Sequence, residues 1–135
     1  LQKAKRNLPA AGPGGLLGVL THLAPSLTKS DSLVGNVVGL PGKLPEVRDE
    51  LVLDFNLLER VMGDIKLSKV EPIREKERLL INIGTARTLG EVEKIKQNKL
   101  FLKLKLPVCA RKGERAAISR QIEGRWRLIG YGKLV

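Results

Sequence analysis

The sequence is poor in cysteine, histidine and aromatic residues, and each shortage excludes a class of protein or site. One cysteine cannot build a disulfide framework, an iron–sulfur cluster or a cysteine zinc site. One histidine leaves almost no room for a histidine metal site or for histidine-based catalysis. Aromatic residues make up 3% of the chain, so leucine, isoleucine and valine must supply the core. No apolar run approaches the roughly 18 residues of a membrane span, so we expect no membrane partner.

The length and the start of the chain limit its organisation. At 135 residues, with 42% of them hydrophobic, the chain can form one hydrophobic core and is not disordered. Basic residues near the start precede an apolar stretch, as in a secretory signal, but Pro9, Gly12 and Pro13 interrupt that stretch. We therefore expect no signal peptide and a cytoplasmic location. The first residue is Leu1 rather than methionine, which is typical of a fragment, a processed product or a trimmed chain.

Positive charge is in excess and is unevenly distributed. The chain has 25 Lys and Arg against 14 Asp and Glu, a net charge of +11. Residues 94–135 carry twelve basic and two acidic residues, whereas residues 34–93 carry nine basic and eleven acidic ones. Such asymmetry favours a polyanionic partner such as RNA, with a solvated, solubilising surface as the alternative.

Apolar and polar residues alternate with a period of two over much of the chain, which is typical of half-buried strands. Leu51, Leu53 and Phe55, for example, share one face, and Asp54 lies on the other. The pattern predicts strands near residues 33–39, 50–61, 78–84, 88–96, 99–106, 114–122 and 126–134. Short antiparallel strands at this spacing predict an all-β fold, either a sandwich or, as we favour, a closed antiparallel β-barrel of about six to seven strands. Closure removes the exposed edges that would otherwise aggregate.

Turns, a loop and strand faces are also predicted. Gln97–Asn98 and Glu123–Gly124 have the composition of tight hairpin turns. Residues 66–77 form a polar insertion around Pro72, which predicts a long loop. Alternate residues of a strand share one face, and this alternation predicts which side chains face the core. The residues predicted to face inward are Leu100, Leu102, Leu104 and Leu106 in one strand and Trp126, Leu128 and Leu134 in another.

The sequence contains no recognisable catalytic constellation. The glycine-rich stretch of residues 12–18 lacks the lysine of a phosphate-binding P-loop, so we interpret it as a connector. His22 and Cys109 are each the only residue of their kind, and Cys109 follows an apolar pair, which favours a small buried side chain. Carboxylates at strand ends, such as Asp49 and Glu50, usually serve solubility. We therefore expect no enzyme, no metal and no other cofactor in this chain.

Basic residues cluster within the seventeen residues that end at Arg127. The candidate contact residues are Arg111, Lys112, Arg115, Arg120, Arg125 and Arg127. Arginine offers a planar fork for phosphate oxygens, so these residues could bind RNA. They could equally pair with an adjoining domain, and both alternatives stay open. Trp126 lies among them and is expected to face the core, because its parity is opposite to that of Arg125 and Arg127.

Several motifs carry a resemblance to a known family. Residues 114–132 read ERAAISRQIEGRWRLIGYG, residues 57–63 read LLERVMG, residues 69–73 read KVEPI and residues 80–90 read LINIGTARTLG. Together with residues 35–39 and 107–109, they span about residues 13–135. The set resembles the gamma subunit of the archaeal and eukaryotic translation initiation factor two, and the archaeal form is the more similar.

The resemblance implies a domain organisation. In that family a GTPase domain is followed by two β-barrels. Residues 33–135 would be the last barrel, similar to the third domain of elongation factor Tu, and residues 1–32 an N-terminal arm, the remnant of the preceding β-barrel and the crossover. This chain lacks the GTPase motifs, so GTP and magnesium are implied only for the missing GTPase domain. Residues 123–125 correspond to a loop that lies near tRNA in elongation factor Tu.

The resemblance also implies partners and a function. The partners would be the small ribosomal subunit and initiator tRNA, together with the alpha and beta subunits of the factor through the full-length protein. The function would be to support delivery of initiator tRNA to the small subunit, by contact with RNA and by packing against other domains. The alternatives are a stand-alone basic β-barrel that binds RNA or the ribosome and, as a third, an enzyme.

Overall fold

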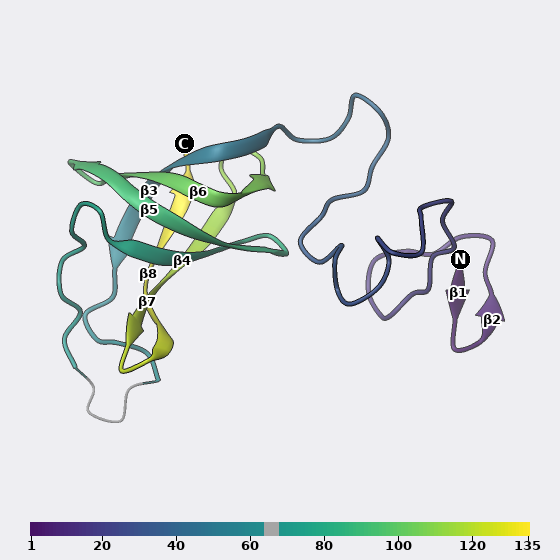
Figure 1. Ribbon diagram of the computed structural model, residues 1–135, viewed down its shortest axis with the longest axis horizontal. Helices are drawn as coiled ribbons and strands as arrows, with labels where there is room; N and C mark the ends of the chain where they lie inside the picture. Colours follow the sequence, from purple (N-terminus) through teal and green to yellow (C-terminus); the bar gives the residue numbers. More distant parts are fainter. Residues whose placement is uncertain (64–67) are drawn as a thin grey trace. The chain divides into compact units, whose positions relative to one another are not determined.

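Figure 1 shows a computed structural model of the chain, which describes residues 1–63 and 68–135. The chain divides into two compact units, Leu1–Leu33 and Val34–Val135. The first unit contains two short antiparallel strands, β1 (Gln2–Lys3) and β2 (Arg6–Asn7). None of its residues is buried, so this unit has no hydrophobic core of its own.

The second unit is a closed barrel of antiparallel strands in the order β3-β6-β5-β4-β7-β8 (Figure 1). The strands are β3 (Val47–Leu57), β4 (Arg78–Ile83), β5 (Ala86–Lys96), β6 (Lys99–Cys109), β7 (Arg115–Ile122) and β8 (Arg125–Leu134). Pairing of β3 with β8, from Leu53 opposite Leu134 to Leu57 opposite Gly130, closes the ring. The predicted all-β fold and closed antiparallel barrel are therefore confirmed.

Six of the predicted strands are present with bounds shifted by a few residues, but the strand predicted near residues 33–39 is wrong. That segment is irregular and exposed; Val34 and Val38, for example, are 70% and 96% exposed. The physical reason is the closure itself. Each strand of the ring already has two hydrogen-bonded neighbours, so another strand has no edge on which to pair.

Aliphatic side chains fill the barrel, as the shortage of aromatic residues requires. The largest fully buried side chains are Leu51, Leu53, Leu79, Ile81, Ile83, Val92, Leu100, Leu102, Ile118 and Ile129. Phe55 packs against this cluster but is only half-buried. The core is therefore made of leucine, isoleucine and valine, drawn from all six strands of the barrel.

Strand irregularities overturn three of the predicted inward positions, Leu106, Leu128 and Trp126. Ile118 pairs with Gly130 and Ser119 with Leu128, so Ile129 is the extra residue of a β-bulge in β8. Ile129 is fully buried, whereas Leu128 is 36% exposed, because the bulge reverses the parity of the strand. Trp126 lies on the same face of β8 as Leu128, opposite the exposed Gln121, so it is half-buried outside the core cluster instead of facing the core. Leu106 is 60% exposed for a similar reason: it lies where the register between β3 and β6 shifts.

Tight turns and one packed loop connect the strands. Gln97–Asn98 joins β5 to β6, and Glu123–Gly124 joins β7 to β8, both as predicted. Of the predicted long loop, Lys66 and Leu67 lie outside the described residues, and residues 68–77 contain no strand. This connection, which we call the 58–77 loop, nevertheless buries Val61, Val70 and Ile73 against the barrel core. Among residues 1–63 and 68–135, no helix has the length and apolar character needed to cross a bilayer.

Candidate nucleic-acid interface

The six predicted contact residues do not form one patch. Because β7 runs from one end of the barrel to the other, the turn before β7 and the turn after β7 lie at opposite ends of the barrel. Arg111 and Lys112 lie in the first turn, whereas Arg125 follows the second. The eight residues of β7 separate these groups by about 25 Å at roughly 3.3 Å per residue. Residues that are close in the sequence are thus placed at the two ends of the barrel.

Arg120 is held by its own domain. Its Nε and Nη2 atoms donate hydrogen bonds to the two carboxylate oxygens of Glu77. Nη1 also donates to the carbonyl oxygen of Glu71 at 2.9 Å, and Nη2 to that of Pro72 at 3.1 Å. The Arg120 and Glu77 side chains are only 17% and 19% exposed. The Arg120 guanidinium therefore fastens the 58–77 loop to β7, and each of its three nitrogen atoms already donates a hydrogen bond.

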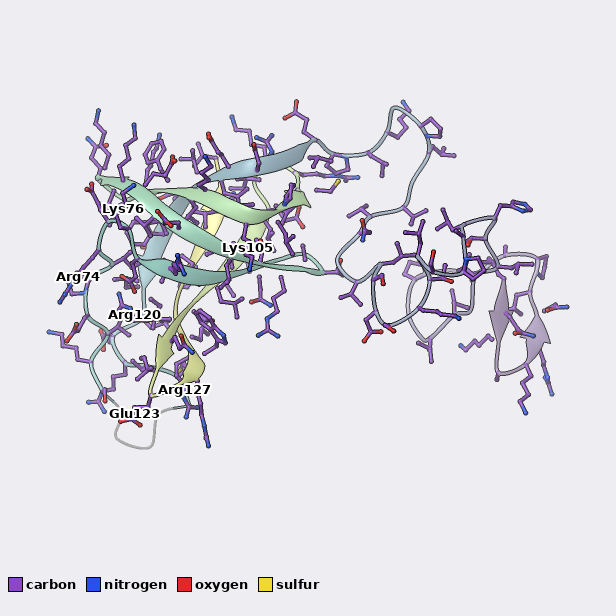
Figure 2. The ribbon with its side chains drawn as sticks, in the orientation of Figure 1. Arg74, Lys76, Lys105, Arg120, Glu123 and Arg127 are labelled. Atoms are coloured by element: carbon purple, nitrogen blue, oxygen red, sulfur yellow. The ribbon has the colours of Figure 1, made fainter. Side chains whose placement is uncertain are left out.

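Arg127 lies directly opposite Arg120 across the β7–β8 pair and also covers the 58–77 loop. A β-carbon at Gly63 would lie 2.9 Å from Nη1 of Arg127, so the guanidinium rests on that glycine. Figure 2 shows Arg120 on the side of the barrel that carries Arg74, and Arg127 toward the end that carries Glu123. Arg125, by contrast, is exposed beside the hairpin turn.

The basic residues at the opposite end of the barrel are more exposed than Arg120 and Arg127. Arg111 and Lys112 are exposed in the turn before β7, which Glu114 orders by accepting a hydrogen bond from the backbone N–H of Arg111 at 2.9 Å. Arg115 is exposed at the start of β7 and lies opposite Lys133 of β8. Sequence reasoning missed Lys133 because this residue lies outside the basic cluster that ends at Arg127. The signal that could have found it was its position on the outward face of the last strand.

One outer wall of the barrel, which we call the Tyr131 face, is formed by two rows of cross-strand neighbours. One row is Asn56, Tyr131, Ala117, Asn82 and Arg87, and the next is Asp54, Lys133 and Arg115. Apart from the half-buried Ala117, all of these residues are exposed. A groove of about 600 Å³ lies here, lined by Asp54, Asn56, Arg115, Tyr131, Gly132 and Lys133. Sequence reasoning missed Tyr131, although an aromatic residue at an outward position was a signal.

Five lysines of the β5–β6 hairpin form a different surface. They are Lys94, Lys96, Lys99, Lys103 and Lys105, and all are exposed (Lys105 is labelled in Figure 2). Carboxylates oppose them on the neighbouring strands: Lys103 lies opposite both Glu50 and Glu91, and Lys99 lies opposite Asp54. This hairpin face therefore carries several carboxylates among its lysines, whereas the Tyr131 face has the single carboxylate Asp54.

The structure offers little catalytic or metal chemistry in the part of the chain that it describes. There, no three His, Cys, Asp or Glu side chains are grouped so that they could hold a metal ion. The thiol of Cys109 is half-buried and donates a hydrogen bond to the carbonyl oxygen of Pro45 at 3.2 Å. Cys109 thus helps to fasten the start of β3 to the end of β6.

Comparison with known proteins identifies similar sequences. The family model described as "Initiation factor eIF2 gamma, C terminal" matches residues 49–134, which include nearly the whole barrel. The chain is 56% identical over 132 residues to translation initiation factor 2 subunit gamma of Thermococcus onnurineus (strain NA1). It is 57% identical over 132 residues to the Pyrococcus abyssi (strain GE5 / Orsay) protein of the same name. Each alignment covers 98% of this chain and 32% of the relative, so the chain spans about a third of their length.

Proposed function

The chain belongs to the initiation factor eIF2 gamma family, whose C-terminal region it matches, and from this we propose that it supports delivery of initiator tRNA to the small ribosomal subunit. It would do so without catalysis, by contacting RNA and by packing against other domains of the factor. GTP and magnesium would be bound by a GTPase domain outside the matched region. The alpha and beta subunits would be partners of the full-length protein, in the cytoplasm.

The observation that carries the RNA contact is the placement of the positive charge. Residues 94–135 hold twelve basic and two acidic residues, and they lie within the barrel unit. Arg120 and Arg127 are engaged with the 58–77 loop, so they serve packing. Arg111, Lys112 and Arg115 are exposed at the other end, where phosphate oxygens could reach them.

The unit of residues 1–33 fits the same proposal. It has two short strands and no buried residue, as expected of an arm that packs in a larger assembly. We assign residues 1–32 to the remnant of the preceding barrel and the crossover, and residues 33–135 to the last barrel.

The test is binding of the 135-residue chain to small ribosomal subunits and to initiator tRNA over a salt series. RNA contact predicts that the logarithm of the association constant falls linearly with the logarithm of the salt concentration, with a slope that counts the phosphates contacted. Absence of binding to both at low salt would contradict the proposed RNA contact.

Charge reversal locates the contact. The variant Arg111→Glu/Lys112→Glu should weaken subunit binding by at least about tenfold and flatten the salt slope. The matched control, Lys96→Glu/Lys105→Glu, makes the same change in net charge on the mixed-charge hairpin and should weaken it by no more than about threefold. Equal losses in the two variants would show that only net charge matters and would refute the assignment to the turn before β7.

A further inference from the structure

Tyr131 is unusual among the aromatic residues of this chain. It is 54% exposed, whereas Phe55, Phe101 and Trp126 are half-buried. Within residues 1–63 and 68–135, the Tyr131 hydroxyl has no hydrogen-bond partner, and no cation lies over its ring, as Lys94 lies over Phe101 at 4.5 Å. A tyrosine gains nothing for the core in this position, so its ring is available to a ligand.

The neighbours of Tyr131 leave room for a flat ligand. Ala117, directly opposite on β7, is the smallest side chain in its row, and Asn56 lies opposite on β3. In the adjacent row, Lys133 and Arg115 oppose each other across β8 and β7. These side chains border the groove of about 600 Å³, which is in the range of small-ligand sites.

The charge of the Tyr131 face favours an anionic ligand. It carries Arg115, Lys133 and Arg87 against the single carboxylate Asp54, with the amides Asn56 and Asn82 between them. Among the described residues, no carboxylate lies within ion-pair distance of Arg115 or Lys133. Exposed cations around an aromatic ring are the arrangement by which proteins hold single-stranded nucleic acid.

We infer that the Tyr131 face is a binding site for unpaired nucleotides of RNA. A base stacks on the ring of Tyr131, and the flanking phosphates lie against Arg115 and Lys133. The amide side chain of Asn56 can donate to or accept from the edge of the stacked base. This inference rests on the proposed function, since it assigns part of the RNA contact to a named surface and limits it to single-stranded segments.

The mode of binding predicts weak sequence preference. Every base has a face that can stack, so the site should accept different bases. A duplex presents no free base face. Its affinity should therefore be raised by the basic residues of the Tyr131 face but not by the ring of Tyr131. The comparison of single-stranded with duplex RNA therefore isolates the contribution of Tyr131.

The experiment measures binding of the 135-residue chain to a fluorescein-labelled ten-nucleotide RNA of mixed sequence and to a duplex of the same strand, by anisotropy. Tyr131→Ala should weaken single-strand binding between about fivefold and about hundredfold, the usual loss for one stacked base. Duplex binding should change by less than about twofold, and Tyr131→Phe should keep the affinity for both RNAs. Leu106→Ala, which truncates another exposed apolar side chain, is the matched control and should change neither.

A second variant keeps the test independent of the tyrosine. Arg115→Gln/Lys133→Gln should lower the slope of log affinity against log salt by about 1.4 for the single strand, since each phosphate contact contributes about 0.7. Equal single-strand affinity for Tyr131→Ala and wild type would overturn the inference and leave the proposed function standing. Equal losses of affinity for the single strand and the duplex in Tyr131→Ala would also overturn it. Binding of a protein domain, and of no RNA, at the Tyr131 face would overturn it as well. Failure of the wild type to bind these RNAs, initiator tRNA and small subunits would refute both proposals.

Discussion

Replacing Arg120 with alanine is expected to lower the free energy of unfolding of the barrel by about 3 kcal/mol. The change removes the hydrogen bonds to Glu77 and those to the carbonyl oxygens of Glu71 and Pro72. Both charged side chains are less than one-fifth exposed, so the Glu77 carboxylate would be left without its charged partner where solvent replaces it poorly. Breaking buried ion pairs costs about 3–5 kcal/mol, and the residual exposure places this pair at the lower bound.

The assays are denaturant unfolding and thermal unfolding, each followed by the fluorescence of Trp126, the only tryptophan, which lies in β8 opposite Gln121. A loss of about 3 kcal/mol should lower the melting temperature by roughly 10–20 °C for a domain of this size. Arg120→Lys keeps the charge but not the fork, and should recover only part of the loss.

A double-mutant cycle with Glu77→Gln separates the ion pair from the rest of the change. The coupling energy between Arg120 and Glu77 should be about 2 kcal/mol, because the two charged groups share two hydrogen bonds. Hydrogen exchange of the Val61 and Val70 amides, which bond to carbonyl oxygens within the 58–77 loop, should accelerate in Arg120→Ala. A loss below about 1 kcal/mol, or a coupling energy near zero, would refute the reasoning that Arg120 fastens this loop.

Two further predictions concern β8. Gly130→Ala would place a β-carbon 2.6 Å from a carbonyl oxygen of β3. In thermal unfolding, this variant should be less stable by about 3 kcal/mol or should fail to fold. A variant of normal stability would contradict the close approach of β3 and β8. Ile129→Ala should cost about 2–5 kcal/mol in denaturant unfolding, whereas Leu128→Ala should cost less than about 1 kcal/mol. The reverse order would mean that β8 has no bulge at this point.

The period-two pattern predicted most of the barrel because a half-buried strand must alternate. Leu51, Leu53, Leu100 and Leu102 are all buried, as their parity required. The pattern failed at Ile129, because a bulge depends on the register with a neighbouring strand and leaves no mark in the sequence of its own strand. It failed at residues 33–39 because apolar alternation cannot tell whether a sheet has an edge left to pair.

The candidate site was harder to predict, because it depends on which strands are neighbours. Arg120 and Glu77 are 43 residues apart in the sequence and meet because β7 pairs with β4, whose first residue follows Glu77. Nothing local to Arg120 indicates this partner. Conversely, Arg111 and Arg125 are close in the sequence and are separated because a complete strand runs between them. Composition predicted a basic surface, but the strand topology decides where on the barrel each basic residue lies.

The closed ring of six strands limits how this domain can be recognised. Many proteins capture a peptide by adding it to a sheet, so that main-chain hydrogen bonds supply much of the affinity. That route needs a strand with unpaired N–H and C=O groups, and each barrel strand already has a neighbour on both sides. A partner is therefore expected to bind mainly through outward side chains and the connecting loops. Affinity can then change one side chain at a time, while the hydrogen-bonded framework beneath stays the same.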